Sequence, residues 1–190
     1  PRSYVLSLAH GTSRHFFFIL PHYIENGVQF GLLERDLSPG LGYAALAALA
    51  ASLGDAKEPR ALLGLPGEAT GWLFSRGDGL AAAAVWAREG TVLPLANGLA
   101  ARDLYGRTIP PGSGGLGGLG GTSGTSGTGG TVGSSGSITI GSRTVYLIGK
   151  PERFAAWKPA DPAPPGEISP APFSFEDIVP RFLFPADRAD

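Results

Sequence analysis

The feature that most constrains this chain of 190 residues is the uninterrupted apolar run HFFFIL at 15–20. Aromatic and branched side chains without polar alternation are typical of a strand that is buried on both faces, as in a parallel sheet. Pro21 ends the run, because proline has no N–H with which to join a neighbouring strand. A strand of this kind needs partners on its edges and layers on its faces, so it cannot fold in isolation.

Helices are predicted on both sides of this strand. Residues 2–10 carry apolar side chains at helical spacing, and the following Gly11 is a favourable helix stop. The sequence YAALAALAASL predicts a second helix that runs to Gly54, with Ser38 as its N-cap and Pro39 at its first position. Helix, buried strand, loop and helix is the order of a βα unit, and one such unit cannot form a sheet by itself.

From about Pro59 the chain consists of short segments separated by Gly, Asp and Pro. Trp72 and Phe74 alternate with smaller or polar residues, which predicts a half-buried strand. The flanks of the alanine run 81–84 favour a hairpin strand over a helix, and SITIG and RTVYLIG within 137–149 predict two more strands. Six or seven short strands at this spacing indicate an antiparallel β-sandwich or barrel.

A glycine-rich segment at 112–137 interrupts the β region. Glycine makes up 13 of the 25 residues from 112 to 136, so no packed element is expected there. Two interpretations stay open, a hairpin loop and a surface-attachment or assembly segment. The tail 151–190 is rich in proline and is predicted to lie extended on the surface. Its expected anchors are Trp157, Phe173, Phe175, Phe182 and Phe184.

Composition excludes several classes of function. The net charge is −1 and no basic cluster with interleaved aromatic residues is present, so neither nucleic acid nor a membrane surface is an expected partner. The chain has no cysteine and only three histidines, without HExxH spacing, so we expect no metal and no cofactor. A GxSxG nucleophile motif is also absent.

The candidate substrate-binding residues follow the buried strand. His22 and Tyr23 lie just past its end, and Glu25 and Asn26 follow in the same polar loop. Aromatic, imidazole and carboxylate groups at such a strand end can stack on a sugar or bind its hydroxyls. The alternative is that His22 and Tyr23 anchor the loop by packing and that Glu25 is a solvated loop acid. Glu34, beside Arg35, is interpreted as one half of a solvated turn ion pair.

The N-terminal part resembles a known family. The sequences YVLSLAHGTSRHFFFIL and FGLLERDLSPGLGYAALAALAASLG resemble the end of the catalytic barrel in clan A glycoside hydrolases, where a "wGLl…d…PkpaYaAl" segment leads into the last helix. The Lys-Pro of that pattern is replaced here by Gly40-Leu41, and the strand-end Trp found in many members has no equivalent. The matching residues are Gly31, Leu32, Leu33, Asp36, Pro39, Tyr43, Ala44 and Leu46.

The β region is similar to the small C-terminal sandwich that many of these enzymes carry. The matching residues are Phe74, Asp78, Gly79, Trp86, Asp103, Tyr105, Gly106, Val145, Tyr146 and Gly149. The resemblance implies an α/β N-terminal piece at 1–54, which is the closing βα unit of a (β/α)8 TIM barrel with strand eight and its flanking helices. It also implies an antiparallel β-sandwich at 55–150, followed by the tail at 151–190.

The function implied by the resemblance is that of the C-terminal portion or subunit of a retaining glycoside hydrolase acting on a poly- or oligosaccharide. In the clan the acid/base and nucleophile glutamates follow barrel strands four and seven, so we expect no catalytic residue in this chain. The expected partners are the carbohydrate and the remaining barrel segment or chain that carries the catalytic carboxylates. The expected location is extracellular or periplasmic.

Two other classes of function remain open. In the first, the chain is a non-catalytic carbohydrate-binding or spacer β-sandwich, with Trp72 or Trp86 as an exposed sugar platform. In the second, it is an extracellular structural or assembly protein that uses the glycine-rich segment as a contact. Exposure of the two tryptophans and deletion of the glycine-rich segment distinguish these possibilities.

Overall fold

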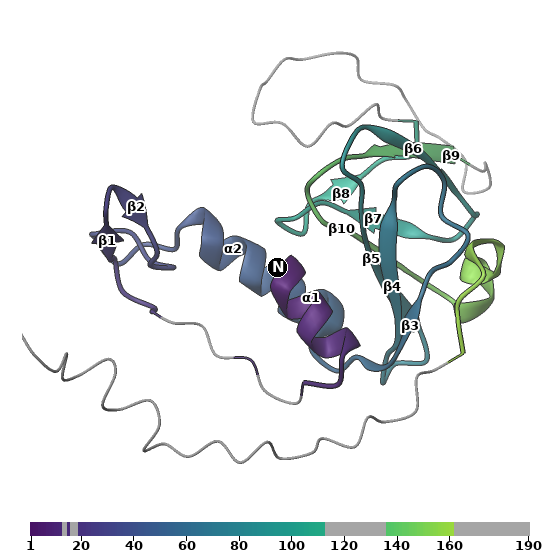
Figure 1. Cartoon of the computed structure of the whole chain (residues 1–190), viewed down its shortest axis with the longest axis horizontal. Helices are drawn as coiled ribbons and strands as arrows, with labels where there is room; N and C mark the ends of the chain where they lie inside the picture. The colour runs from purple at the N-terminus through teal and green to yellow at the C-terminus, as the bar shows by residue number, and fades with distance from the viewer. Residues whose placement is uncertain (13–14, 16–18, 113–135, 162–190) are drawn as a thin grey trace, which may run out of the picture.

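A computed structural model describes residues 1–12, 15, 19–112 and 136–161 of the chain (Figure 1). The helices of this part are α1 (Arg2–Ala9), α2 (Leu41–Leu53) and the 3-10 helix η1 (Pro151–Trp157). The strands are β1 (Ile24–Glu25), β2 (Val28–Gln29), β3 (Lys57–Ala61), β4 (Thr70–Ser75), β5 (Ala81–Trp86), β6 (Thr91–Leu95), β7 (Ala100–Arg102), β8 (Thr108–Ile109), β9 (Gly136–Ile140) and β10 (Val145–Gly149).

The described part of the chain is rich in antiparallel β-structure. Six strands form a sheet in the order β3-β4-β5-β10-β7-β8, and β6 pairs with β9 in a second sheet. The hairpin β1–β2 lies apart from both sheets, at the N-terminal end of α2 (Figure 1). The predicted antiparallel β-rich region is therefore confirmed.

Both faces of the six-stranded sheet are covered. On one face, side chains of β6 and β9 pack with Phe154 and Trp157 of η1 against the sheet. On the other face, Val5 of α1 and Leu49 and Leu53 of α2 pack against Phe74 and its neighbours in the sheet. The described part of the chain therefore has three layers, and the sheet lies between the helices and the β6–β9 pair.

The alanine run explains how the middle layer packs. All six residues of β5 are buried, as expected for a central strand with covered faces. In register, Ala82 lies between Phe74 and Ile148, and Ala84 lies between Trp72 and Tyr146. Small side chains on the central strand make room for the large ones on its two neighbours, so the layers close without overlap.

The strand prediction for the alanine run and its hairpin with β4 are thus confirmed. The predicted half-burial of β4 is wrong, because Phe74 is only 1% exposed and Leu73 is buried on the opposite face. The prediction for β4 assumed that one face of the strand is in contact with solvent, but helices α1 and α2 cover that face. That layer is made by distant parts of the chain, so local alternation does not reveal it.

Both predicted helices are present, and one of their ends differs from the prediction. Gly11 follows α1 with φ +78°, as expected of a helix stop. The N-cap of α2 is Gly40 and not Ser38. The hydroxyl and amide of Ser38 donate instead to Asp36, and Pro39 forms an isolated β-bridge with Leu33, so both residues belong to the preceding loop.

The predicted strand at 15–20 is not seen in its described residues. His15, Ile19 and Leu20 lie outside any strand, and residues 16–18 lie outside the described part of the chain. The tail begins with η1 and not with extended backbone. Trp157 is buried as predicted, whereas Phe173, Phe175, Phe182 and Phe184 lie outside the described residues.

The two ends of the glycine-rich segment meet at one point. The amide of Gly112 donates a hydrogen bond of 2.8 Å to the carbonyl oxygen of Ser137. Gly136 packs against Pro111 so closely that a Cβ there would clash. Residues 113–135 between them lie outside the described residues, so the chain leaves the β region and re-enters it at the same place.

Enlarging the central strand on its helix-facing side is expected to destabilise the fold. Ala84→Leu should lower the free energy of unfolding by about 1–3 kcal/mol, because overpacking forces side chains and layers apart. The matched control is Ala100→Leu, on an exposed position of β7 in the same sheet. Urea unfolding followed by tryptophan fluorescence measures both, and equal stability of the two variants would contradict the packing argument.

Replacing residues 113–135 by a two-residue turn is expected to leave the fold intact. The ends already meet, and each halving of a connection lowers its closure cost by roughly 0.6 kcal/mol. The shortened chain should therefore be at least as stable, as measured by thermal unfolding. Its mass in solution, measured by light scattering, tests the assembly interpretation, which requires that the deletion changes the oligomeric state.

Candidate functional site

A short hairpin forms the end of the molecule that carries the candidate site. Asn26 and Gly27 connect β1 and β2 with φ +49° and +77°. Two central residues with positive φ define the type I′ turn, for which Asn-Gly is the favoured sequence. We predicted only a polar loop here, although the Asn-Gly pair was the signal that identifies the hairpin. Asn26 thus has a structural role in the turn.

The segment from Leu20 to Gly40 is fixed to the start of α2. The amides of Leu32 and Leu33 both donate to the carbonyl oxygen of Leu20, at 3.1 and 3.0 Å. The amide of Gly40 donates to the carbonyl of Leu32 at 2.9 Å. Gly31 lies directly on the backbone of Pro21, where any Cβ would clash with the carbonyl oxygen. This close approach explains why the segment requires glycine at 31.

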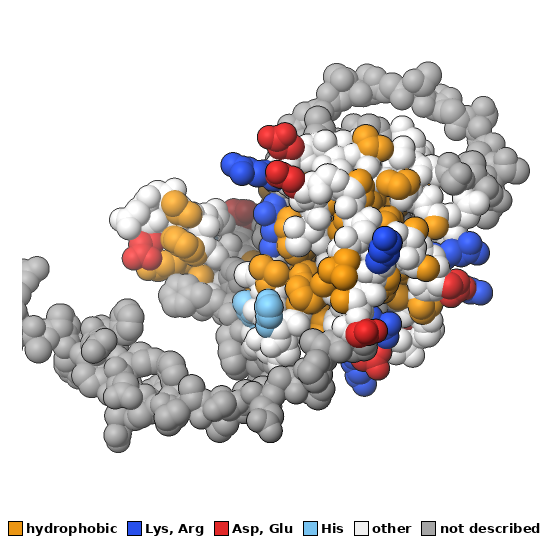
Figure 2. Space-filling model, turned by 45° about the vertical axis from the view of Figure 1, so that its right-hand side comes forward, with side chains coloured by type: hydrophobic (Ala, Val, Ile, Leu, Met, Phe, Trp, Pro, Cys, Tyr) orange, Lys and Arg blue, Asp and Glu red, His pale blue; other side chains and the backbone are white. Residues whose placement is uncertain are grey.

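Exposed large hydrophobic side chains gather on this N-terminal part. Figure 2 shows hydrophobic side chains on the part of the molecule that projects to the left, away from the sheets. Elsewhere in the described residues only Leu63 and Val92 are large, hydrophobic and exposed. The residues of the exposed apolar surface are Leu6, Leu20, Ile24, Val28, Phe30, Leu37, Leu41 and Tyr43. A gathering of this kind is typical of an interaction surface.

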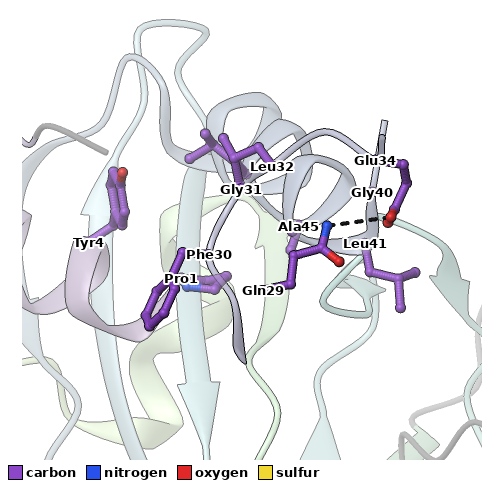
Figure 3. A pocket seen from close by; sticks show the side chains of 12 residues that line it. Pro1, Tyr4, Gln29, Phe30, Gly31, Leu32, Glu34, Gly40, Leu41 and Ala45 are labelled. Carbon is purple, nitrogen blue, oxygen red and sulfur yellow. Dashed lines mark hydrogen bonds between the residues drawn. The ribbon is translucent and has the colours of Figure 1, made fainter. Parts of the chain in front are cut away.

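A pocket of about 440 Å³ opens within this surface, between α1, residues 29–34 and the first turns of α2 (Figure 3). Its walls include the side chains of Tyr4, Phe30 and Leu41. Gln29 Nε2 lies 3.4 Å from Glu34 Oε2 at its polar side. The volume and the mostly apolar lining fit either a small ligand or a bulky side chain of a partner.

None of the four predicted substrate-binding residues forms the wall of this pocket, and two of them, His22 and Tyr23, lie next to its lining residues Gly31 and Phe30. His22 and Tyr23 are half-buried, and the Tyr23 ring lies 6.4 Å from the ring of Phe30. Glu25 and Asn26 are exposed on the hairpin. Both ring nitrogens of His22 are buried without a hydrogen-bond partner in the described structure. His22 therefore has unsatisfied hydrogen-bonding capacity next to the pocket.

Sequence reasoning missed the residues that form the pocket. Neither Tyr4 nor Phe30 was singled out as a binding residue, and Leu41 was considered only as a departure from a motif. Phe30 and Leu41 are 44% and 57% exposed, which apolar spacing alone does not show. One sequence signal could have revealed the pocket: residues 20–43 contain more apolar side chains than one βα unit can bury.

The acidic residues near the pocket have structural partners. Asp36 Oδ1 accepts hydrogen bonds from Ser38 Oγ at 2.6 Å and Ser38 N at 3.0 Å, and these hold the pKa of Asp36 below its ordinary value. Its stabilising contribution is therefore present above the ordinary pKa and is lost as pH falls through the lowered value. The prediction of an ion pair between Glu34 and Arg35 is wrong, because the ion pairs of the described residues do not include it. The carboxylate of Glu34 faces the side-chain amide of Gln29 instead.

Neither candidate tryptophan forms an exposed sugar platform. Trp86 is only 9% exposed, and the guanidinium of Arg2 lies 5.7 Å from its ring centre. Trp72 is half-buried, with the ring of His10 edge-on at 5.8 Å. Both rings face the helical layer, so they hold α1 on the sheet.

The described residues contain no group of three or more His, Cys, Asp or Glu side chains arranged to hold a metal ion. Within the same ranges, each helix is too short or too polar to cross a bilayer.

Comparison with solved structures defines the class of fold. The chain is similar to a family 39 glycoside hydrolase from the gut symbiont Bacteroides cellulosilyticus WH2, with a TM-score of 0.50 and 21% sequence identity. The match covers 78% of this chain and 29% of that enzyme, so the present chain corresponds to less than a third of its length. At this identity the likeness is one of fold. Neither a protein-family model nor a curated protein sequence matches the chain.

Adding a methyl group at Gly31 is expected to disrupt the site segment. In Gly31→Ala the new Cβ collides with the Pro21 carbonyl, so the segment must move away from its hydrogen bonds. The control is Gly141→Ala, where an added Cβ meets nothing within 4 Å. Hydrogen exchange of the Leu32 and Leu33 amides should accelerate at least tenfold in Gly31→Ala only, the factor for loss of about 1.4 kcal/mol. Unchanged exchange would show that the segment tolerates the methyl group.

Proposed function

We propose that this chain is the C-terminal portion of a retaining glycoside hydrolase that acts on a poly- or oligosaccharide. The observation that carries the proposal is the fold shared with part of a family 39 glycoside hydrolase over 78% of this chain. The order of motifs from Gly31 to Gly149 supports the same assignment. Residues 1–54 are then the closing βα unit of a TIM barrel.

The exposed apolar surface supports the proposal that the rest of a barrel packs against this chain. A two-stranded hairpin with Ile24 52% and Val28 54% exposed gains little stability alone in water. The pocket between α1 and α2 likewise leaves apolar walls open. Both features are accounted for if a neighbouring βα unit packs on this surface, with an apolar side chain in the pocket. The remaining barrel segment or chain is therefore the partner we propose.

The chemistry assigned to the whole enzyme is a double displacement. In retaining enzymes two carboxyl groups about 5–5.5 Å apart act as nucleophile and acid/base, with a covalent glycosyl-enzyme intermediate. We assign both groups to the missing barrel portion. Asp36 is held by its turn, and Glu34 lies at the N-terminal end of α2, where the helix dipole favours its charge.

The role left for this chain is part of the site rim. We assign to the inner part of this rim His22, whose buried ring nitrogens have no hydrogen-bond partner among the described residues, and Tyr23, whose ring lies beside that of Phe30. Glu25 and Asn26 on the hairpin are the outer part of the same rim. Among the four, His22 is the strongest candidate because an unsatisfied buried imidazole is costly unless a partner completes it.

A charge placed in the pocket is expected to block assembly with the barrel without unfolding the chain. Leu41 is 57% exposed, so Leu41→Glu should change the free energy of unfolding by less than about 0.5 kcal/mol. The matched control is Val92→Glu, at a 60% exposed position of β6. Co-expression with the preceding barrel portion, followed by co-purification and aryl-glycoside hydrolysis, should fail for Leu41→Glu alone. Normal activity of both variants would refute the surface assignment.

The function itself is tested with a mechanism-based label. A 2-deoxy-2-fluoro glycoside should trap a glycosyl group on a glutamate of the barrel portion, and peptide mass spectrometry should find no label within residues 1–190. Cleavage of aryl glycosides by the 190-residue chain alone would show that no further barrel portion is required. Absence of hydrolysis by the complete assembly on a panel of aryl glycosides would overturn the assignment as a hydrolase.

A further inference from the structure

We propose that Arg76, in the turn between β4 and β5, is a positioning residue that fixes the direction of α2 and thereby the location of the site segment 20–40. The role at a sugar site rests on the function proposed above. The mechanical part does not, because it follows from contacts within this chain. Arg76 itself lies at the opposite end of α2 from the pocket.

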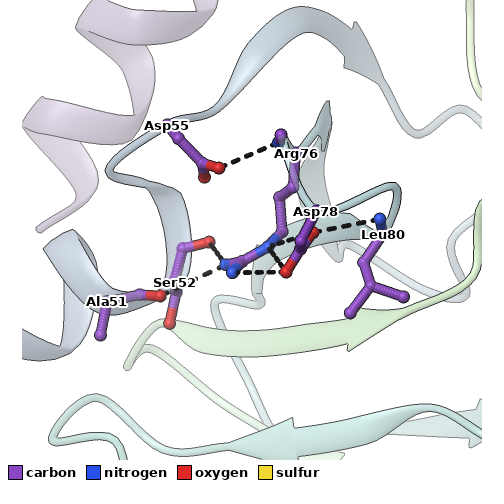
Figure 4. Close-up of polar contacts among 7 residues, drawn as sticks. Ala51, Ser52, Asp55, Arg76, Asp78 and Leu80 are labelled. Carbon is purple, nitrogen blue, oxygen red and sulfur yellow. Dashed lines mark hydrogen bonds and ion pairs between the residues drawn. The ribbon is translucent and has the colours of Figure 1, made fainter.

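Arg76 completes the hydrogen bonding at the C-terminus of α2 (Figure 4). A helix leaves its last four carbonyl groups without partners within the helix. Here the carbonyls of Ala50 and Leu53 accept from the amides of Gly54 and Ala56. The carbonyls of Ala51 and Ser52, which lie between them, accept hydrogen bonds from Arg76 Nη1 at 3.2 and 2.5 Å. One guanidinium group therefore satisfies half of the helix terminus.

The guanidinium is held in place from the other side. Its Nη2 and Nε lie 3.0 and 3.2 Å from the two carboxylate oxygens of Asp78, a fork geometry that fixes its plane. The Arg76 side chain is only 16% exposed. Asp55, just after α2, accepts a hydrogen bond from the amide of Gly77 at 2.9 Å. The turn and the end of the helix are thus cross-linked in both directions.

A second contact holds the middle of α2 against the sheet. Ala48 and Leu49 lie in one buried cluster with Phe74 and Tyr146 of the sheet, and a Cβ added to Gly106 in the loop after β7 would be in ordinary van der Waals contact with Ala48. Asp103 shapes this loop, because its carboxylate accepts from the amides of Tyr105 and Arg107. The middle of α2 is therefore held by apolar packing, and its C-terminus is held by directional hydrogen bonds. Two separated contacts define the direction of a rigid rod.

The site segment is attached at the free end of that rod. Leu32 and Gly40 join it to the first turn of α2, and the hairpin projects beyond it (Figure 1). A helix of 13 residues is about 20 Å long, so a tilt of roughly 5° at one end moves the other by about 2 Å. A displacement of about 1 Å can reduce catalysis on the order of a hundredfold. A small loss of constraint at Arg76 is thus amplified at the pocket.

The absence of cysteine allows a direct test by distance measurement. Spin labels on Glu25→Cys and Val92→Cys report the hairpin relative to the β6–β9 layer, and labels on Val92→Cys and Ala100→Cys report the β-rich part alone. In the full 190-residue chain, Arg76→Gln should broaden the first distance distribution by roughly 2 Å and leave the second unchanged. The matched control is Arg60→Gln, which loses only an exposed pair with Glu58.

An unchanged first distribution, or equal broadening of both, would overturn the positioning role in favour of a purely stabilising one. Asp78→Asn keeps the donor but removes its bidentate acceptor and should give an intermediate width, which also serves if Arg76→Gln fails to fold. In the assembled enzyme, kcat/KM for an aryl glycoside should fall in Arg76→Gln and recover partly in Arg76→Lys. If Arg76→Gln broadens the first distance distribution but the parent assembly has no glycosidase activity, the proposed function is refuted and the positioning role of Arg76 stands.

Discussion

The contact on which the rest of the structure depends is the closure of two layers on the alanine-lined strand β5. Helices α1 and α2 approach one face and the β6–β9 pair approaches the other, because Ala82, Ala83 and Ala84 occupy little space between larger neighbours. Parts that the sequence suggests are separate, a βα unit and a β-sandwich, therefore share one of the two core clusters, the one on the helix-facing side of the sheet. The direction of α2 is set by that core, and the pocket lies where α2 extends beyond it.

Much of the fold follows from local sequence rules. The ends of α1, the existence of α2, and strands β4, β5, β9 and β10 follow from spacing, glycine placement and β-branched residues. The start of α2 does not. Ser38 is a favourable N-cap in isolation, but its hydroxyl donates to Asp36 two residues earlier, and that turn takes the residue away from the helix. Local preferences that compete over the same two or three residues cannot be ranked without the backbone geometry.

The four predicted binding residues and the pocket belong to the same part of the chain, but other side chains build the pocket wall. His22 and Tyr23 do lie beside the pocket, while Asn26 specifies a turn and the pocket wall is built by Tyr4, Phe30 and Leu41. A pocket depends on which apolar side chains remain uncovered after packing, and this is decided by elements far apart in the chain. The clamp at Arg76 was hidden for the same reason, because its acceptors lie 24 and 25 residues away.

The hydrogen bond between Gly112 and Ser137 has an evolutionary consequence. A segment whose ends are already joined can change its length and composition without changing the geometry of the strands on either side. Replication slippage in a repetitive glycine-coding tract changes length in small steps, and each step is neutral for the core at this junction. The same junction is a natural place to insert a fluorescent domain or to open new termini by circular permutation. At this junction, therefore, the length of the chain can vary without cost to the core of the described residues.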